Sequence, residues 1–442
     1  MAEYRFKQLN IPKAGCSSTE GSLTSDERYP QLSGRARNDG MNGERDSIKD
    51  AQSRPEDVAD ATANRNFCAR DANVPEHEPG QRETLLASLD SSTDPELIAV
   101  KLLIQHQVDF FAVPTMHPHP GSTGLLDRNN IQSVGIGFKR IRGRLTNKLC
   151  VVVGVTRKAP MNDVEVSVRI PGQIWWRGQT YSTDVVEVTP VGVNFGLVQG
   201  PTPPPQQACT AGTKRFARPV PCGVSTSNYL DGTNTAGTIG CRVKLNNVGT
   251  TMCILSCNHV LGRENAAAVG SSVLQPGKGD LGKHPADQIG ALKDLVKLKL
   301  QPSINYVDMA VASTNSNLTS PQLNCIGAIS STYINPSVGM LLRKVGKMTN
   351  YTHAARIDTI ATSVVIDFGI GLLKFEGISK VDNTPTFVMF GDSGSIALKE
   401  STTSPVGMMI AGSGVVGILV PMSTMFNTPF FYSGVKLLQI VV

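Results

Sequence analysis

Short apolar runs separated by turn residues fill the second half of the chain, and they restrict it to a mainly β fold. Apolar residues at helical spacing are scarce there, while 42 glycines and 27 prolines favour frequent turns. Recurring short strands with turn signals between them are typical of β-barrels and β-sandwiches. We therefore predict an all-β domain over residues 216–442. The runs lie at 239–244, 251–256, 288–297, 306–312, 339–346, 362–367, 371–376, 386–397 and 405–420.

The longest uncharged stretch, residues 405–422, is long enough for a membrane helix to be considered. Its four glycines and two prolines, with Gly412 and Gly414 in the middle, favour two short buried strands around a turn. We therefore expect no membrane span here.

The first half of the chain has a different organisation. Residues 1–84 are polar and mixed in charge, which predicts a disordered leader. Residues 85–198 combine a helical pattern, in which Asp94 can cap a helix, with Val- and Ile-rich runs, so we expect a small α+β domain. Residues 199–215 contain three consecutive prolines and are predicted to be a linker.

Charge and cysteine content argue against several functions. The net charge is +6 and only 5% of residues are aromatic, which is not typical of a nucleic-acid binder. The nine cysteines form no Cys-x-x-Cys pair, and the two histidines at 117–120 lack a further ligand, so we expect no metal and no cofactor. The N-terminus lacks the apolar core of a signal peptide, which indicates a cytoplasmic protein with reduced thiols.

One loop could carry chemistry, because Ser393 lies between Asp392 and Gly394 in the stretch TFVMFGDSGSIAL. An ordinary tight turn has the same composition. A serine nucleophile needs a nearby base, and that base needs an orienting partner. His259 follows the apolar run of MCILSCNHVLG, and Asp308 stands in the apolar INYVDMAVAST, where a lone carboxylate has to be paired.

The motifs ILSCNHVLG, YVDMAVA and FGDSGSIAL, in this order, resemble the His, Asp and Ser motifs of trypsin-like serine proteases, which have a two-barrel chymotrypsin fold. More narrowly, the chain over about 218–418 is similar to an intracellular bacterial and plant group that includes the NARROW LEAF protein. The resemblance implies a serine endopeptidase with His259, Asp308 and Ser393 as the catalytic residues, acting on a protein or peptide substrate without a cofactor.

The resemblance also implies which residues form the oxyanion hole and which contact the substrate. The amides of Gly391 and Ser393 would form the oxyanion hole. Substrate would contact a pocket floor at Phe387 and Val388, and it would pair with the strand that ends in Ala411, Gly412 and Ser413. This floor has no acidic residue, so we expect an apolar or small side chain in the pocket and not Lys or Arg.

Some features leave other interpretations open. Ser395 and Ile396 stand where the family has glycine and proline, and no activation sequence explains what pairs with Asp392. The alternative function is a catalytically weak protease-fold module that binds peptides or acts as a scaffold. The region before the protease domain could form a homo-oligomer. In residues 343–357, Gly346 and Thr349 are expected to shape a hairpin, with His353 on the surface.

Overall fold

The described part of the computed structural model lies within one compact unit, Val74–Val442. It comprises residues 93–112, 131–164, 170–193, 213–233, 235–246 and 251–442. The predicted leader (1–84), the histidines at 117–120 and most of the predicted linker (199–215) lie outside these residues. Those expectations therefore stay predictions, as do the domain boundaries.

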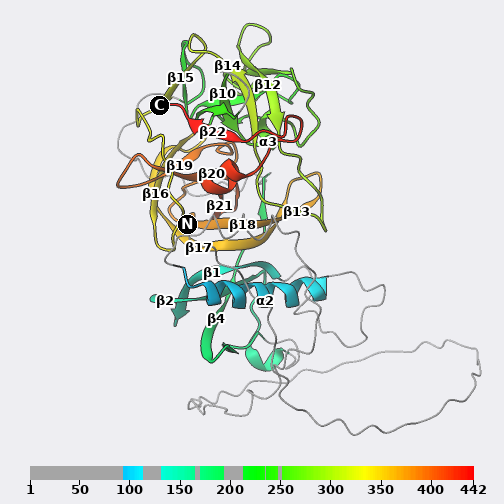
Figure 1. The fold of residues 1–442 in the computed structure, drawn as a ribbon, viewed down its shortest axis with the longest axis vertical. Helices are drawn as coiled ribbons and strands as arrows, with labels where there is room; N and C mark the ends of the chain where they lie inside the picture. The colour runs from blue at the N-terminus through cyan, green and yellow to red at the C-terminus, as the bar shows by residue number, and fades with distance from the viewer. Residues whose placement is uncertain (1–92, 113–130, 165–169, 194–212, 234, 247–250) are drawn as a thin grey trace, which may run out of the picture. The chain divides into compact units, whose positions relative to one another are not determined.

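An eight-stranded antiparallel sheet is the first of two large sheets in the predicted all-β domain, residues 216–442. Its strands have the spatial order β22-β9-β10-β14-β12-β11-β7-β8. They are β7 (Ser225–Asn228), β8 (Gly237–Thr238), β9 (Arg242–Leu245), β10 (Met252–Ser256), β11 (Ser272–Leu274), β12 (Gln288–Leu295), β14 (Ala310–Thr314) and β22 (Leu437–Ile440). These are the green strands, with red β22, at the top of Figure 1.

A closed ring of strands forms the second layer. In the order β18-β21-β20-β19-β16-β17, each strand pairs with the next, and β17 pairs back with β18. Closing the ring pairs each of its strands on both sides along most of its length, although β19 pairs with β20 only as far as Met408. The strands are β16 (Leu341–Gly346), β17 (Asn350–Asp367), β18 (Leu372–Asp382), β19 (Ile396–Lys399), β20 (Pro405–Gly412) and β21 (Val416–Pro421).

Five strands from the first half of the chain and one short strand from the second half extend this second sheet to twelve strands. β1 pairs antiparallel with β17, placing Ser133 opposite Val364, and β2, β4 and β3 follow outward (Figure 1). The buried ammonium of Lys101, on α2, donates to Ser363 Oγ at 2.8 Å. The sheet therefore continues from the predicted all-β domain into the predicted α+β region. These elements are α2 (Pro95–Ala112), β1 (Ile131–Ile141), β2 (Arg144–Val155), β3 (Gln173–Trp176) and β4 (Gln179–Glu187).

The remaining strands and helices are short. β5 (Val191–Gly192) and β13 (Ile304–Asn305) join the twelve-stranded sheet, and β6 (Val220–Cys222) pairs with β15 (Thr319–Leu323). The short helices are η1 (Met161–Asp163), α3 (Asn258–Leu261), η3 (Lys278–Asp280) and α4 (Met422–Asn427).

The predicted mainly β fold is confirmed, and so is the hairpin in residues 405–422. β20 and β21 form this hairpin with fully buried strands, which explains why the stretch carries no charge. The helix at α2 is also as predicted, and Asp94 Oδ1 accepts the amide of Glu96 at 2.9 Å as a cap. In the described residues, none of the helices has the length and apolar character needed to cross a membrane.

The cysteine expectation needs one correction. Five described cysteines are free and buried, namely Cys150, Cys222, Cys241, Cys253 and Cys257. Cys325, however, is disulfide-bonded, so the prediction of reduced thiols is wrong at this residue.

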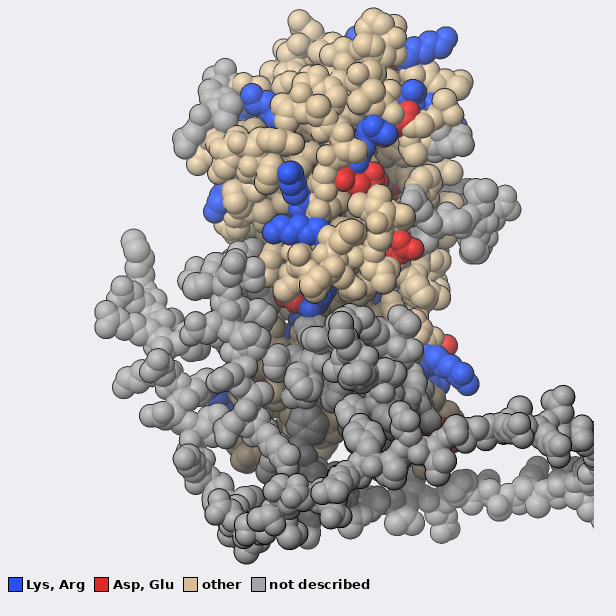
Figure 2. Space-filling view, turned by 90° about the vertical axis from the view of Figure 1, so that its right-hand side faces the viewer, with Lys and Arg blue, Asp and Glu red and all other residues tan. Residues whose placement is uncertain are grey.

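Charged side chains do not gather into one patch on the face that Figure 2 shows. Lys and Arg side chains are scattered over the described surface there, with Asp and Glu side chains between them. The positive net charge is thus not concentrated on this face.

Candidate active site

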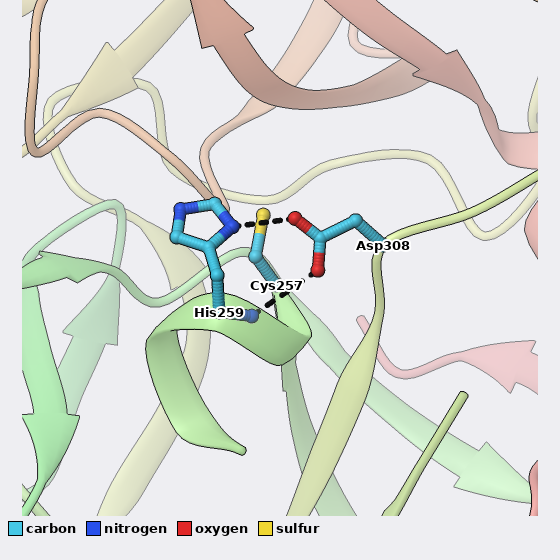
Figure 3. Close-up of side chains that lie close together, drawn as sticks. All are labelled: Cys257, His259 and Asp308. Atoms are coloured by element: carbon cyan, nitrogen blue, oxygen red, sulfur yellow. Dashed lines mark hydrogen bonds and ion pairs between the residues drawn. The ribbon is translucent and has the colours of Figure 1, made fainter. Parts of the chain in front are cut away.

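His259 and Asp308 meet because of the register of two neighbouring strands. β10 and β14 are antiparallel with Ser256 opposite Ala310, so the residues just beyond the end of β10 lie beside those just before β14. His259 Nδ1 lies 2.5 Å from Asp308 Oδ2, and the His259 amide donates to Oδ1 at 3.2 Å (Figure 3). Asp308 is fully buried, so its carboxylate fixes both the ring and the backbone of His259.

The surroundings of His259 favour its protonated form. Burial by itself lowers the pKa of the imidazole, but the charge and the hydrogen bond of Asp308, followed by the charges of Glu264 and Asp231, raise it. The net result is a pKa above the usual histidine value. An imidazole with such a pKa is a stronger base, and a carboxylate partner stabilises the imidazolium that forms when it accepts a proton.

Cys257 lies beside this pair, and the three side chains form the only group of possible metal ligands found in the described residues (Figure 3). Their ligand atoms lie within 4.8 Å of one another. Burial, and then the charge of Asp308, raise the pKa of the Cys257 thiol well above its usual value, so it stays protonated. Its sulfur donates to Met409 O at 3.6 Å, and His259 Nδ1 is engaged by Asp308, which favours a hydrogen-bonded cluster over a metal centre.

Ser393 lies on a loop that bridges the two sheets. Its carbonyl accepts the amide of Thr238 in β8 at 2.8 Å, while the next amide, of Gly394, donates to Met409 O in β20 at 2.8 Å. Met409 O is also the acceptor of the Cys257 thiol, so the residues flanking Ser393 and His259 converge on one carbonyl group. The Ser393 side chain is 8% exposed, and Oγ donates to Ile410 O at 3.3 Å.

The predicted oxyanion-hole amides are available. Among the described residues, no hydrogen-bond acceptor is paired with the amide of Gly391 or of Ser393. Gly391 has φ +100°, a conformation that an L side chain rarely adopts, and its carbonyl accepts the hydroxyl of Thr238 at 2.8 Å. The Gly391 carbonyl is thus fixed, while the amides of Gly391 and Ser393 have no hydrogen-bond acceptor among the described residues.

Sequence reasoning left the partner of Asp392 open, and the structure supplies it. Lys344 Nζ lies 3.1 Å from Asp392 Oδ2, and the hydroxyl of Thr349 donates to the same oxygen at 2.7 Å. The amides of Met348, Thr349 and Met389 donate to the carboxylate as well, at 2.8, 3.1 and 3.0 Å. Burial lowers the pKa of Lys344, although Asp392 opposes this shift.

Residues 343–357 therefore do more than form a hairpin. The expected hairpin is present, between β16 and β17. Gly346 is required for the approach of Asp392, because a Cβ at this position would lie 2.4 Å from Oδ1. His353 is partly exposed and pairs with Glu400 at 3.0 Å. The segment RKVGK contains one arginine and two lysines, and the sequence alone did not indicate that Lys344 would be the buried one.

The five residues predicted to bind substrate are largely buried around one polar side chain. Asn383 Oδ1 accepts the amides of Phe387 and Val388 at 2.6 and 2.7 Å, and Nδ2 donates to the carbonyls of Val388 and Ser413 at 3.0 and 2.8 Å. A Cβ on Gly412 would lie 3.0 Å from Val388 Cγ1. Val388, Gly412 and Ser413 thus lie close together, with Ala411 next to them on the strand, and their role in substrate binding stays a prediction.

Phe387 has a different environment from the one expected of a pocket floor. It is 1% exposed, and its ring lies 5.3 Å from Lys344 Nζ. It therefore packs beneath the loop next to the buried ion pair. Ser395 is fully buried, and its hydroxyl has no hydrogen-bond partner among the described residues, so this side chain does not reach the surface where a substrate would bind.

No protein-family model and no curated protein matches the sequence. Several solved structures are similar to half of the chain or less. A glutamic acid specific serine protease is 15% identical, covers 50% of this chain and 100% of its own, and has a TM-score of 0.35. A Cellulomonas bogoriensis chymotrypsin is 15% identical over 50% of this chain and 98% of its own, with a TM-score of 0.32.

A third similar structure is the active form of the Rv3671c protease from M. tuberculosis, at 13% identity over 46% of this chain and 76% of its own, with a TM-score of 0.28. Likenesses with such low scores carry no argument about activity. The narrower resemblance to the NARROW LEAF-like group stays a prediction.

Proposed function

We propose that this chain is a serine endopeptidase that cleaves peptide bonds through an acyl-enzyme intermediate on Ser393. The observation that carries the proposal is the buried His259–Asp308 pair, held at the end of one sheet beside the loop of Ser393. The unpaired amides of Gly391 and Ser393 add a place for a negatively charged oxygen.

In the proposed reaction, Ser393 Oγ leaves Ile410 O, donates its proton to His259 Nε2 and adds to the scissile carbonyl carbon. The carbonyl oxygen becomes an oxyanion and accepts hydrogen bonds from the amides of Gly391 and Ser393. The C–N bond then breaks, and the leaving amine takes the proton from His259. Water attacks the resulting ester by the same route and regenerates the hydroxyl, while Asp308 keeps the imidazole in one tautomer.

The substrate would be an extended peptide with an apolar or small side chain in the pocket. None of the proposed contact residues carries a carboxylate that could pair with Lys or Arg; they are Phe387, Val388, Ala411, Gly412 and Ser413. Proteome-wide cleavage mapping of wild type against Ser393→Ala tests this preference. A set of cleavage sites dominated by Lys or Arg would contradict it.

Labelling by a fluorophosphonate probe tests the proposed activity. The probe should modify Ser393 in the wild type, and labelling should disappear in Ser393→Ala and His259→Ala. Ser395→Ala is the matched control, since it removes a neighbouring hydroxyl that is buried away from the site. Absence of labelling in a well-folded protein that also shows no peptide hydrolysis would refute the proposal.

One observation favours the alternative, a module that binds peptides without useful turnover. The Ser393 hydroxyl donates to Ile410 O and is largely buried, so it is not presented to solvent. Peptide binding that is unchanged by Ser393→Ala, together with no detectable hydrolysis, would support this function over the peptidase.

A further inference from the structure

Three different segments contact, one after another, the edge of β20 that faces Ser393. β19 pairs with β20 near Met408 and then departs. The next contacts on β20 come from the Ser393 loop, through Met409 O and Ile410 O. Beyond them, at Gly412, the partner of β20 is β5 (Val191–Gly192), a segment from the first half of the chain.

β5 has the orientation of an added peptide strand. Gly192 pairs antiparallel with Gly412, so at this pair β5 is directed toward the Ile410 end of β20. Ile410 O is the acceptor of Ser393 Oγ, and consecutive strand residues are about 3.3 Å apart. The direction of β5 is therefore toward the proposed nucleophile, along the backbone groups that an extended substrate would use.

Contacts on all sides hold residues 189–193 in this position. On the side opposite β20, β5 pairs with the end of β17, and the amide of Val193 donates to Asp367 O at 2.9 Å. The hydroxyls of Thr189 and Ser413 lie 2.8 Å apart. Val191 and Val193 are 6% and 3% exposed and belong to the same buried cluster as Ile410.

The same buried cluster also contacts His259. Phe368, which follows the end of β17, belongs to it and meets the His259 ring edge to face, with 5.7 Å between the ring centroids. Residues 189–193 thus fill the space between the hairpin of β17 and β18 and the end of β20. An external peptide cannot pair with Gly412 while β5 is in place.

We infer that residues 189–193 are a tethered occupant of the substrate-binding strand and keep the site latent, an inference that rests on the proposed peptidase function. A tethered segment competes at the high effective concentration of an intramolecular ligand, about millimolar for short flexible connections. Substrate must displace β5 from both Gly412 and Asp367 before it can align with Ser393.

Binding of a peptide separates this inference from catalysis. In the full chain carrying Ser393→Ala, a fluorescein-labelled peptide of residues 186–193 (VEVTPVGV) should bind weakly. Two double variants weaken β5. Adding Gly192→Pro to Ser393→Ala removes the Gly192 amide hydrogen, and adding Val193→Asp instead places a charge at the buried position of Val193. Each double variant should bind the peptide about tenfold tighter or better by fluorescence anisotropy, since the competitor is weakened. Glu187→Gln, at the end of β4, is the control and should change nothing.

Probe labelling of Ser393 in the otherwise wild-type chain completes the test. Gly192→Pro or Val193→Asp should increase its rate about tenfold or more, and circular dichroism shows which variant is folded. Equal peptide affinity in all folded variants, or no binding to any, overturns the inference. If the β5 substitutions raise peptide affinity but no variant is labelled, β5 is an occupant of the strand and the peptidase function is refuted. If all variants are labelled at the same rate, the latency is refuted and the peptidase function is supported.

Discussion

Lys344 Nζ lies 3.1 Å from Oδ2 of Asp392, and neither side chain is exposed to solvent. The carboxylate that precedes Ser393 is thereby neutralised by a group within the same sheet, on β16. No chain cleavage is needed to create this partner, because the ion pair forms when β16 and the Ser393 loop fold together. The pair explains how the loop can hold its shape although the sequence shows no activation signal.

Replacement of Lys344 by Met should therefore cost both stability and activity. Removing one partner of a buried ion pair leaves an uncompensated charge and typically costs about 3–5 kcal/mol. We expect a loss of this size in urea unfolding, together with loss of probe labelling at Ser393. Lys214→Met is the control, because its 71% exposed side chain, 3.7 Å from Asp280, should contribute about 1 kcal/mol or less. Similar losses for both variants would show that the ion pair does not hold the loop.

The pH dependence of labelling should report the environment of His259. The reaction needs the neutral imidazole, so the rate should rise with pH through a pKa above the usual histidine value. Glu264→Gln removes one of the charges that raise this pKa, so the rise should move to lower pH. Glu400→Gln, which changes the partner of the distant His353, should leave the profile in place. A shift to higher pH in Glu264→Gln would contradict the assigned electrostatics.

The parts of the candidate site that depend on local motifs could be predicted from the sequence. His259 and Asp308 each lie at the edge of an apolar strand, and a buried carboxylate requires a partner, so their pairing could be predicted. Lys344 could not, because its burial depends on how β16 packs against the Ser393 loop. The pairing of β5 with Gly412 could not be predicted either, since it is set by long-range contacts.

The mainly β fold class could also be predicted from local sequence patterns, but the number of strands that join each sheet could not. Turn-bounded apolar runs predicted β9, β10, β12, β14 and β16 to β21, whereas the short strands β11, β13 and β15 had no such run. The pairing of β1 with β17 joins segments far apart in sequence, and nothing in either strand specifies its neighbour.

The turn after the nucleophile should not accept a side chain. Gly394 has φ +95°, and a Cβ there would lie 2.2 Å from Ser256 Oγ and 2.3 Å from Thr238 O. Gly394→Ala should therefore cost about 2 kcal/mol or more in urea unfolding and reduce labelling of Ser393. Gly414→Ala is the matched control, since nothing lies within 4 Å of its added Cβ. An unchanged unfolding midpoint in Gly394→Ala would mean that the loop can relax.

Asn383 should link stability to substrate affinity. Asn383→Ala leaves the amides of Phe387 and Val388 and the carbonyl of Ser413 without this partner, and each buried unsatisfied group costs about 1–3 kcal/mol. We expect a lower unfolding midpoint and, for the folded fraction, a raised KM with a smaller change in kcat. The exposed neighbour Thr384, changed to Ala, should alter neither constant. A fall in kcat with an unchanged KM would place the effect on Ser393 and not on the substrate strand.

Asp308→Asn should separate the role of the carboxylate in catalysis from its role in packing. The amide keeps the volume of the side chain but holds the imidazole in the wrong tautomer, a change that lowers kcat about ten-thousandfold in the serine protease where it was measured. We expect a loss of about a thousandfold or more in peptide hydrolysis. Because its side-chain oxygen can still accept the His259 amide, which lies 3.2 Å from Asp308 Oδ1, the fold should survive in circular dichroism. A folded variant that retains wild-type kcat would exclude Asp308 from the proposed mechanism.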